Sequence, residues 1–597
     1  MVQPKKARNR AGVAERRVGM AGVARSAWWQ EAWVQAMNRL AARRAARAEP
    51  AAGFVSQPEP RTIGLYARGK QLVAGNFLFA GHLVEAPGLD LWDIARPSPA
   101  YEAELHGFAW LDDLAAVGDP AARKRAQDWT FGWIARHGRG QGMGWSPDLT
   151  GRRLIRWINH AILLLGGQNR DRSLAYYHSL SQQTLFLSRR WQAASPGLPR
   201  FEALTGLIYA GLALIGMEDH VDPAAAALAR ECTREIDAQG GIPTRNPEEL
   251  LEVFTLLTWA AQALADAGRV VPASHLEAIE RIAPTLRALR HADGGLARFH
   301  GGGRGLEGRL DHALANSGVK PAPHPGPAMG FVRLSAGRSS LVVDAAPPPG
   351  GQAGASAHAS TLAFELTSGR RPVVVNCGSG APFGADWHRA SRATQSHSTL
   401  SIDGYSSSRF AHDGREVLEL CANVAPLQNA AGDPDPHLLA GHDGWRATHG
   451  VQHLRDLTLS ADGRHLAGVD MLLAETPDDQ ARLTALYRRQ RAGLGFAIRF
   501  HLHPDADVAL DMGGTAVSIA LRSGEIWVFR HDGAARLSLE PSVYLEKGRL
   551  MPRATRQILL SAELKGFEAR IGWTLAKAQD TPLAIRDLDR EDPTSRP

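Results

Sequence analysis

The period of the hydrophobic pattern changes near residue 325, and this change limits the folds open to the chain. From about residue 100 to 295, apolar residues recur at helical spacing. After about residue 325 they alternate along short runs, as in strands, and Ser-Gly, Ala-Asp-Gly and His-Asp-Gly turns separate these runs. A chain with helices first and strands second has two separate cores rather than one mixed sheet.

Within the helical part, capping sequences predict where helices begin and end. Asp119 and Asn246 each precede a proline, Asp148 precedes another apolar-periodic run, and Gly138 closes a helix. Helices joined by short turns form an array of helical hairpins. Closed on itself, such an array is an α/α toroid, and left open it is a solenoid. The periodicity does not distinguish these two forms.

The alternating runs predict an antiparallel β-sandwich, because many strands follow one another with hairpin spacing and without intervening helices. We therefore predict a multidomain α + β protein, with a ligand site in a cleft between its helical and β domains. The predicted divisions are a basic N-terminal tail (1–55), a helical domain (56–320), an antiparallel β-sandwich (321–575) and a polar C-terminal tail (576–597).

The formal net charge of +7 comes from the N-terminal tail, which argues against a nucleic-acid-binding protein. Residues 1–47 hold eleven lysines and arginines against two acidic residues, so the rest of the chain is close to −2. The sequence "SAWWQEAWVQAMNRLAARRAARA" predicts a basic helix carrying Trp28, Trp29 and Trp33. Such a helix contacts an anionic membrane surface, docks on the body of the protein, or belongs to an import peptide.

Cysteine usage and hydropathy predict a cytoplasmic protein. Cys232, Cys377 and Cys421 lack CxxC spacing, so they form neither a disulfide framework nor a thiolate metal site. No apolar run reaches the roughly 18–20 residues that span a bilayer, and "MVQPKKARNRAGVAERRVG" lacks the apolar core of a secretory signal. The periplasm or cell envelope is the alternative if the start is misassigned.

Four segments resemble the heparinase II/III family of polysaccharide lyases. "WHRASRATQSHSTLSIDG" has the residues and spacing of that family's W-x4-R-x-T-x2-H-x-T motif. "HASTLAFEL" resembles its HxDxLSFEL strand, "RPVVVNCGSG" its strand ending in Asp-x-Gly, and "WSPDLTGRRLIRWINH" an early helix with Arg and Trp. The resemblance spans about residues 60–570 and is strongest at 355–405. It implies an incomplete α/α toroid followed by an antiparallel β-sandwich.

The resemblance also implies a carbon–oxygen lyase that acts by β-elimination on a uronic-acid-containing anionic polysaccharide. Such a reaction needs the uronate carboxylate neutralised, a base for the C5 proton, and an acid for the departing C4 oxygen. Family members supply these groups from an Asn-His pair, a Tyr and a His on the first sandwich strand. Some add a metal held by a second His, an Asp and another His.

Several of these positions carry other residues in this chain. Leu198 and Pro199 match the Asn-His pair, Glu249 falls at the Tyr, and Ser356 replaces the proposed catalytic His. The sequence therefore predicts a rearranged or degenerate active site. The candidate catalytic residues of a rearranged site are His358, His397, Tyr405 and Glu249.

His358, Asn376 and His397 match the metal-associated positions of the family. They imply a divalent metal such as Zn²⁺, although Asn376 removes the anionic ligand that favours zinc. The alternative is a hydrogen-bonded His–Asn–His group that ties three strands together.

Guanidinium groups suit carboxylates or sulfates, and indole rings stack on sugars. The alternatives for these residue types are a solvated helix face for arginines and core packing for tryptophans. The candidate substrate-binding residues are Arg153, Trp157, Arg200, Arg245, Trp387 and Arg392.

Three functions follow as hypotheses. The first is a divergent lyase with a rearranged base. The second is a catalytically silent protein that binds an anionic glycan. The third is a scaffold whose helical domain and basic tail bind a protein partner or the membrane surface.

Overall fold

The computed structural model describes residues 29, 31–56, 60–322, 324, 326–411, 416–424, 428–430, 435–490 and 492–579. It divides into two compact units. The first comprises residues up to Phe79, Val84–Glu231 and Trp259–Pro272. The second comprises Ala80–Leu83, Cys232–Thr258 and the chain from Ala273 onward. The helical segments 232–258 and 273–316 thus group with the strands, whereas the sequence predicts a boundary near residue 320.

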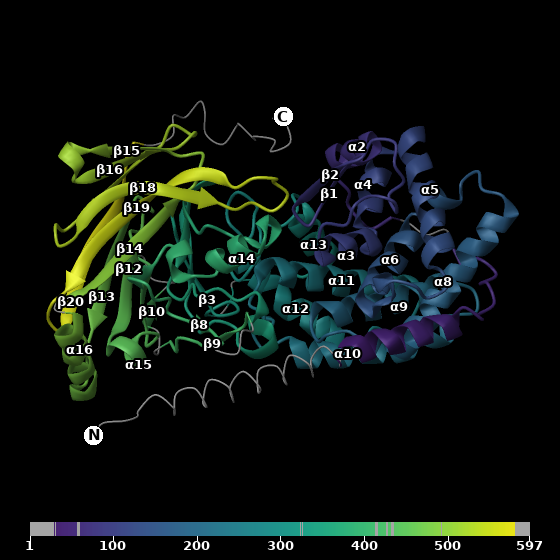
Figure 1. Cartoon of the computed structure of the whole chain (residues 1–597), viewed down its shortest axis with the longest axis horizontal. Coiled ribbons are helices and arrows are strands. Elements are labelled where there is room, and N and C mark those ends of the chain that lie inside the picture. The colour runs from purple at the N-terminus through teal and green to yellow at the C-terminus, as the bar shows by residue number, and fades with distance from the viewer. Residues whose placement is uncertain are drawn as a thin grey trace, which may run out of the picture. The chain divides into compact units, whose positions relative to one another are not determined.

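Helices dominate the chain up to residue 316, in agreement with the predicted helical array (Figure 1). They are α2 (Tyr66–Ala74), α3 (Pro99–Gly107), α4 (Ala109–Val117), α5 (Pro120–His137), α6 (Pro147–Asn159), α7 (Ala161–Leu165), α8 (Arg170–Arg190), α9 (Leu198–Ala213), α10 (Val221–Glu235), α11 (Pro247–Asp266), α12 (Ala273–Ala288) and α13 (Arg309–Asn316).

The predicted caps define the ends of several of these helices. The Asp119 side chain accepts a hydrogen bond from the backbone N–H of Ala122 at the start of α5, which Gly138 ends. Asn246 Oδ1 accepts from the backbone N–H groups of Glu248 and Glu249 at the start of α11. Helix α6 begins at Pro147, so Asp148 lies in its first turn instead of capping it.

Helices α6 and α9 approach so closely that only glycine fits at their contact. A Cβ atom on Gly151 would lie 2.2 Å from the carbonyl oxygen of Glu202, and one on Gly206 would lie 2.5 Å from the Cα of Gly151. Both distances are far shorter than a van der Waals contact, so the two glycines set the packing of this helix pair.

The described part of the basic N-terminal segment is helical over residues 31–45 and docks on α8. Arg190 donates to Asn38 Oδ1 at 2.8 Å, and Gln182 donates to the carbonyl of Ala42 at 3.0 Å. Trp33 remains exposed. The predicted role of Trp28 concerns a residue outside the described part of the chain.

The strands form two large antiparallel sheets, together with the small pairs β1 (Asn76–Phe79) with β2 (His82–Glu85) and β8 (Arg409–Phe410) with β9 (Leu418–Leu420). The first large sheet has the order β10 (Gln428–Ala430), β11 (His437–His442), β12 (Gln452–Leu459), β13 (His465–Leu473), β20 (Glu568–Gln579), β17 (Ile526–His531), β16 (Ala516–Ala520) and β15 (Asp507–Asp511). The second has the order β18 (Arg536–Tyr544), β19 (Arg553–Leu564), β14 (Leu494–Leu502), β6 (Arg371–Val375), β5 (Phe364–Ser368), β4 (Ser339–Asp344) and β3 (Phe331–Ala336), and β7 (Leu400–Ile402) also pairs with β14.

The two large sheets share one hydrophobic core, as the predicted sandwich requires. Phe364 and Phe500 of the second sheet contact Trp573 of the first, with ring centroids 5.9 and 4.7 Å apart. Phe529 packs against Phe500 at 4.9 Å. Short helices lie between strands of this unit: α14 (Ala385–Ser391), α15 (Arg446–His449) and α16 (Pro477–Gln490). The predicted fold class, an incomplete α/α toroid followed by an antiparallel β-sandwich, is confirmed.

Two of the three kinds of predicted turn close hairpins. Ser-Gly joins β5 to β6, and Ala-Asp-Gly joins β12 to β13. The His-Asp-Gly turn instead connects β17 to β18, which belong to different sheets. Strand β20 ends at Gln579, four residues beyond the predicted end of the sandwich. Among the described residues, no helix combines the length and the apolar character needed to cross a bilayer.

Candidate functional site

The strongest concentration of titratable groups in the predicted motifs is a buried imidazole cluster in the second unit. It consists of His300, His358 and His397 together with Asp344, and all four side chains are almost completely buried. His358 precedes β5, His397 precedes β7, and Asp344 ends β4. The fold thus brings together segments that are up to about a hundred residues apart.

Hydrogen bonds define the protonation of the three rings. His397 Nδ1 lies 2.8 Å from the carbonyl oxygen of Ala393 and therefore donates to it. Its Nε2 then accepts from His358 Nδ1 at 3.0 Å. The backbone N–H of His358 donates to His300 Nδ1 at 3.2 Å, so the His300 proton is on Nε2, which lies 3.4 Å from Asp344 Oδ2. His358 Nε2 is left as a buried lone pair without a hydrogen-bond donor among the described residues.

Asp344 is the charged centre of this cluster. Arg245 donates to its Oδ1 at 2.6 Å, and Ser360 donates to its Oδ2 at 2.6 Å. Burial alone would raise the pKa of the Asp344 carboxyl, but Arg245 and His300 outweigh burial and hold that pKa below its ordinary value. Asp344 is therefore a buried carboxylate that is fully paired.

The imidazoles of the cluster are neutral near pH 7. Burial lowers the pKa of His397 to about 4, and burial also lowers the pKa of His300 and, to a greater extent, that of His358. A neutral ring is the form that accepts protons or binds metals, but these rings have no exposed surface to offer a polymeric substrate.

The three residues at the family's metal positions do not fit a zinc site. Asn376 Oδ1 accepts the backbone N–H of Ser398 at 2.9 Å, and the amide carries no charge to offer a cation. His358 and His397 are hydrogen-bonded to each other, and Asp344 is committed to Arg245 and Ser360. Among the described residues, no group of three His, Cys, Asp or Glu side chains is arranged to hold a metal. The predicted His–Asn–His group is only partly formed, because Asn376 contacts the backbone next to His397 and neither imidazole.

Two of the predicted substrate-binding arginines hold backbone segments in place. Arg392 donates to the carbonyls of Ala357, Glu416 and Gly354 at 2.7–2.8 Å, and burial lowers its pKa to about 10. Arg245 donates to several backbone carbonyls, including that of Pro347 at 2.7 Å, besides its contact with Asp344. These donors are used within the protein, and a substrate contact of either arginine stays a prediction.

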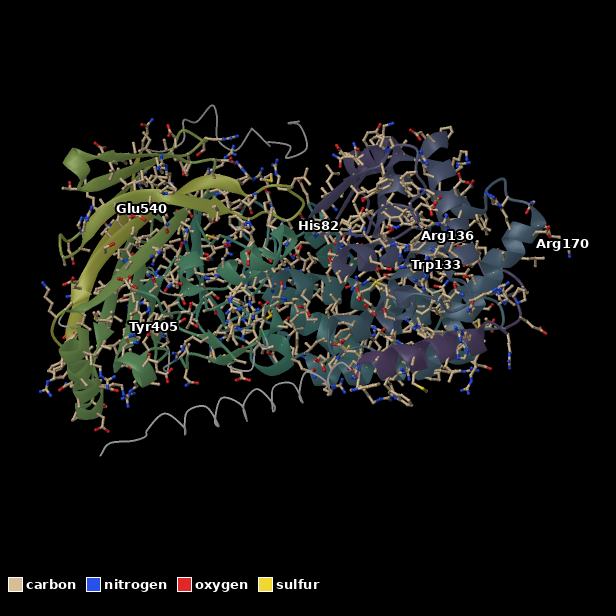
Figure 2. The ribbon with its side chains drawn as sticks, viewed as in Figure 1. His82, Trp133, Arg136, Arg170, Tyr405 and Glu540 are labelled. Carbon is tan, nitrogen blue, oxygen red and sulfur yellow. The ribbon has the colours of Figure 1, made fainter. Side chains whose placement is uncertain are left out.

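In the first unit, Arg153, Trp157 and Arg200 also have structural roles. Arg153 is fully buried, donates to Gln183 and to two carbonyls, and lies 3.9 Å from the Trp133 ring, which Figure 2 labels among the helices. Trp157 is fully buried among aromatic rings, Trp133 among them. Arg200 donates to the carbonyl of Ala194 at 3.0 Å and to Glu231. Arg153 and Trp157 are thus buried and Arg200 is paired within the protein, and their predicted substrate contacts stay predictions.

Trp387 and Tyr405 are more exposed than the other candidate site residues, whereas Glu249 is not. Trp387 on α14 is 37% exposed, and Tyr405, labelled in Figure 2, is 44% exposed with its ring packed edge-on against His449. Glu249 lies in the first turn of α11, where burial raises the pKa of its carboxyl. Tyr405 and Glu249 form no hydrogen bond or ring contact with His358 or His397 among the described residues, and the catalytic roles of the four candidates stay predictions.

Sequence reasoning missed His300 and Asp344, which complete the cluster. His300 stands before three consecutive glycines with a φ of 47°, a conformation rare for histidine. Asp344 ends the apolar strand run "SSLVVD". A histidine beside a glycine run and a carboxylate closing a buried strand are both local signals, but neither identifies a partner.

Comparison with known proteins assigns the family. Residues 318–574 match the profile described as heparinase II/III-like, C-terminal. FtsZ-localized protein C of Caulobacter vibrioides is 31% identical over 545 residues, which cover 88% of this chain and 91% of that protein. The chain belongs to the heparinase II/III-like family.

Solved structures agree with the family's fold. The crystal structure of heparinase III has a TM-score of 0.63 at 12% identity, covering 90% of this chain and 88% of that one. A mutant of heparan sulfate lyase HepC from Pedobacter heparinus has a TM-score of 0.57 at 14% identity, covering 92% and 89%. At such low identities these heparinase-like structures establish the shared fold alone.

Proposed function

We propose that this protein is an FtsZ-associated member of the heparinase II/III-like family that acts by binding and not by cleaving a glycan. The observation that carries the proposal is the 31% identity to FtsZ-localized protein C over 91% of that protein's length. Identity to the two lyase structures is 12–14%. The proposal develops the third hypothesis from the sequence, a scaffold that binds a protein partner.

The chemistry of the site supports the same proposal. Leu198, Pro199 and Ser356 occupy positions at which the lyase resemblance calls for Asn, His and His. None of the three supplies an acid or base of the kind that uronate β-elimination requires. The buried imidazoles and the paired Asp344 instead join strands and loops of one domain.

Two further predictions from the sequence concern the cellular location and the basic N-terminal tail. The cytoplasmic location predicted from the sequence stays a prediction. The predicted contact of the tail with a membrane surface rests on the basic helix that carries Trp28, Trp29 and Trp33, whose described part, residues 31–45, docks on α8. That contact stays a prediction.

Localisation in Caulobacter vibrioides tests the proposal. A fluorescent fusion of the full chain is expected to coincide with the FtsZ band at midcell and to disperse when FtsZ is depleted. The fluorescent protein alone is the matched control. A diffuse signal in cells that retain their FtsZ band would overturn the proposal.

The lyase alternative has its own test. Purified protein is incubated with heparan sulfate, chondroitin, hyaluronan or alginate, and the ultraviolet absorbance of unsaturated uronate is followed. No increase is expected. An increase that is lost in Tyr405→Phe or Glu249→Gln would instead support a lyase with a rearranged base, and binding of one polymer without turnover would favour a glycan-binding protein.

A further inference from the structure

A cavity of about 270 Å³ lies within the second unit, apart from the imidazole cluster. It is lined by the segment that follows α12, by strands β5 and β6, by the loop after β14, and by the ends of β18 and β19. Its volume is slightly below the range of ~300–1,000 Å³ that is usual for drug-sized ligands. A small metabolite is therefore the size of ligand that it accommodates.

The inner wall of the cavity carries an ion pair between Arg298 and Glu365. Arg298 stacks on the Tyr544 ring at 3.9 Å and donates to the carbonyls of Asn376 and Leu545. Glu365 accepts the backbone N–H of Arg298 at 3.1 Å, and its other oxygen lies 3.7 Å from Arg298 Nε. These contacts fix the tyrosine ring and keep the wall close to electrically neutral.

Two groups that line this wall have a hydrogen-bond donor with no partner among the described residues. Tyr544 is only 7% exposed, and its hydroxyl forms no hydrogen bond with the described residues. His503 packs edge-on against Tyr544 at 5.0 Å, and its Nδ1 accepts the backbone N–H of Asp505 at 3.2 Å. The His503 proton is therefore on Nε2, where it is available to a ligand.

An exposed arginine side chain, Arg370, lies at the mouth of the cavity. Most charged residues there form ion pairs, such as Arg304 with Asp293 and Arg553 with Asp505. Arg370 is exposed, lines the cavity, and has no ion pair or hydrogen bond within the described chain. In contrast, Glu365 Oε1 and His291 Nδ1 are acceptors nearby that form no hydrogen bond within the described chain, and both are sealed from solvent.

The groups that remain available to a ligand are thus a hydroxyl, an imidazole N–H and a guanidinium. We propose that this cavity binds a small oxyanion, the carboxylate or phosphate group of a metabolite, through Tyr544, His503 and Arg370. Charge-assisted hydrogen bonds from such donors are the stronger kind in proteins. The site is separate from the proposed association with FtsZ and does not depend on it.

Isothermal titration calorimetry on the full chain tests this site. The probes are inorganic phosphate, glycerol 3-phosphate, acetate and lactate, and the controls without an oxyanion are glycerol and ethylammonium. At least one oxyanion is expected to bind while both controls do not, and the tighter class identifies the ligand as phosphate or carboxylate. Absence of binding by all four oxyanions, or equal binding by glycerol, would overturn the proposal.

Two substitutions test the residues. Tyr544→Phe removes only an unpartnered hydroxyl and keeps the ring on which Arg298 stacks, and Arg370→Ala changes an exposed side chain, so both variants should fold. Binding of the oxyanion is expected to weaken about tenfold in Tyr544→Phe and several-fold in Arg370→Ala. Tyr66→Phe and Arg556→Ala are matched controls with exposed side chains outside the cavity. Unchanged affinity in both test variants would refute the assignment.

Discussion

His358 Nδ1 donates to His397 Nε2 across 3.0 Å, and both rings are sealed from solvent. The two imidazoles therefore satisfy each other where the family's metal-binding members place ligands. Asn376, a neutral amide, supplies no anionic ligand at this position and accepts the backbone N–H of Ser398.

This arrangement predicts a protein that does not require zinc. After dialysis, plasma mass spectrometry is expected to find well under one zinc per chain, and EDTA is expected to leave the midpoint of thermal unfolding unchanged. His358→Gln should have the same metal content as the parent. One zinc per chain in the parent, absent from His358→Gln, would contradict this account.

The depressed pKa of His397 predicts a loss of stability in acid. Its pKa is about 4 in the folded protein and about 6.5 when exposed, so the unfolded chain takes up the proton first as the pH falls. The contribution of His397 to the free energy of unfolding is complete above about pH 6.5 and is lost as the pH falls toward 4. It amounts to about 3 kcal/mol at most.

His397→Gln removes the pH-dependent contribution of His397 to the free energy of unfolding. Between pH 7.5 and 5, the free energy of unfolding measured in urea should fall by about 2 kcal/mol less in this variant than in the parent. His312→Gln, at an exposed histidine of α13, is the control and should retain the parent's pH dependence. Equal pH dependence in His397→Gln and the parent would mean that His397 is not held neutral by burial.

Asp344→Asn should be strongly destabilising, because it leaves Arg245 buried beside an uncharged amide. Removal of one partner from a buried ion pair costs about 3–5 kcal/mol. Asp222→Asn is the matched control, since the Asp222 side chain is 75% exposed and lies 3.3 Å from Arg269. That change should cost less than about 1 kcal/mol. Similar losses in the two variants, measured by urea unfolding, would refute the central role of Asp344.

Gly151→Ala should separate α6 from α9. The added methyl group would lie 2.2 Å from the carbonyl oxygen of Glu202, and overpacking of this kind costs about 1–3 kcal/mol or more. Gly107→Ala in α3 is the matched helical control, because its nearest neighbour, Arg152 Cδ, would lie at 3.4 Å. The thermal midpoint should fall for Gly151→Ala and stay constant or rise for Gly107→Ala. Equal midpoints would show that the close helix contact is not required.

The sequence predicts the order of helices and strands well, because hydrophobic period and caps act within a few residues. Asp119 and Asn246 cap the helices expected of them. The path of the chain after the His-Asp-Gly turn is not predictable in this way. A local turn sequence does not reveal whether the next strand pairs with the last or crosses to another sheet.

Side-chain roles could not be predicted in the same way. Arg245 meets Asp344 ninety-nine positions along the chain, and His358 meets His300 across fifty-eight. Arg392, proposed from its motif to bind a substrate, donates to the backbone carbonyls of Ala357 and Gly354. Such partners depend on the tertiary fold. The sequence around an arginine does not reveal whether its side chain contacts a ligand or a loop of the same protein.

Co-sedimentation with FtsZ tests the central proposal most directly. The purified full chain is mixed with FtsZ from Caulobacter vibrioides and centrifuged with GTP, to form FtsZ polymers, or with GDP. The chain is expected to enter the pellet with GTP and to remain in the supernatant with GDP. A chain that stays in the supernatant while FtsZ polymers sediment would contradict it.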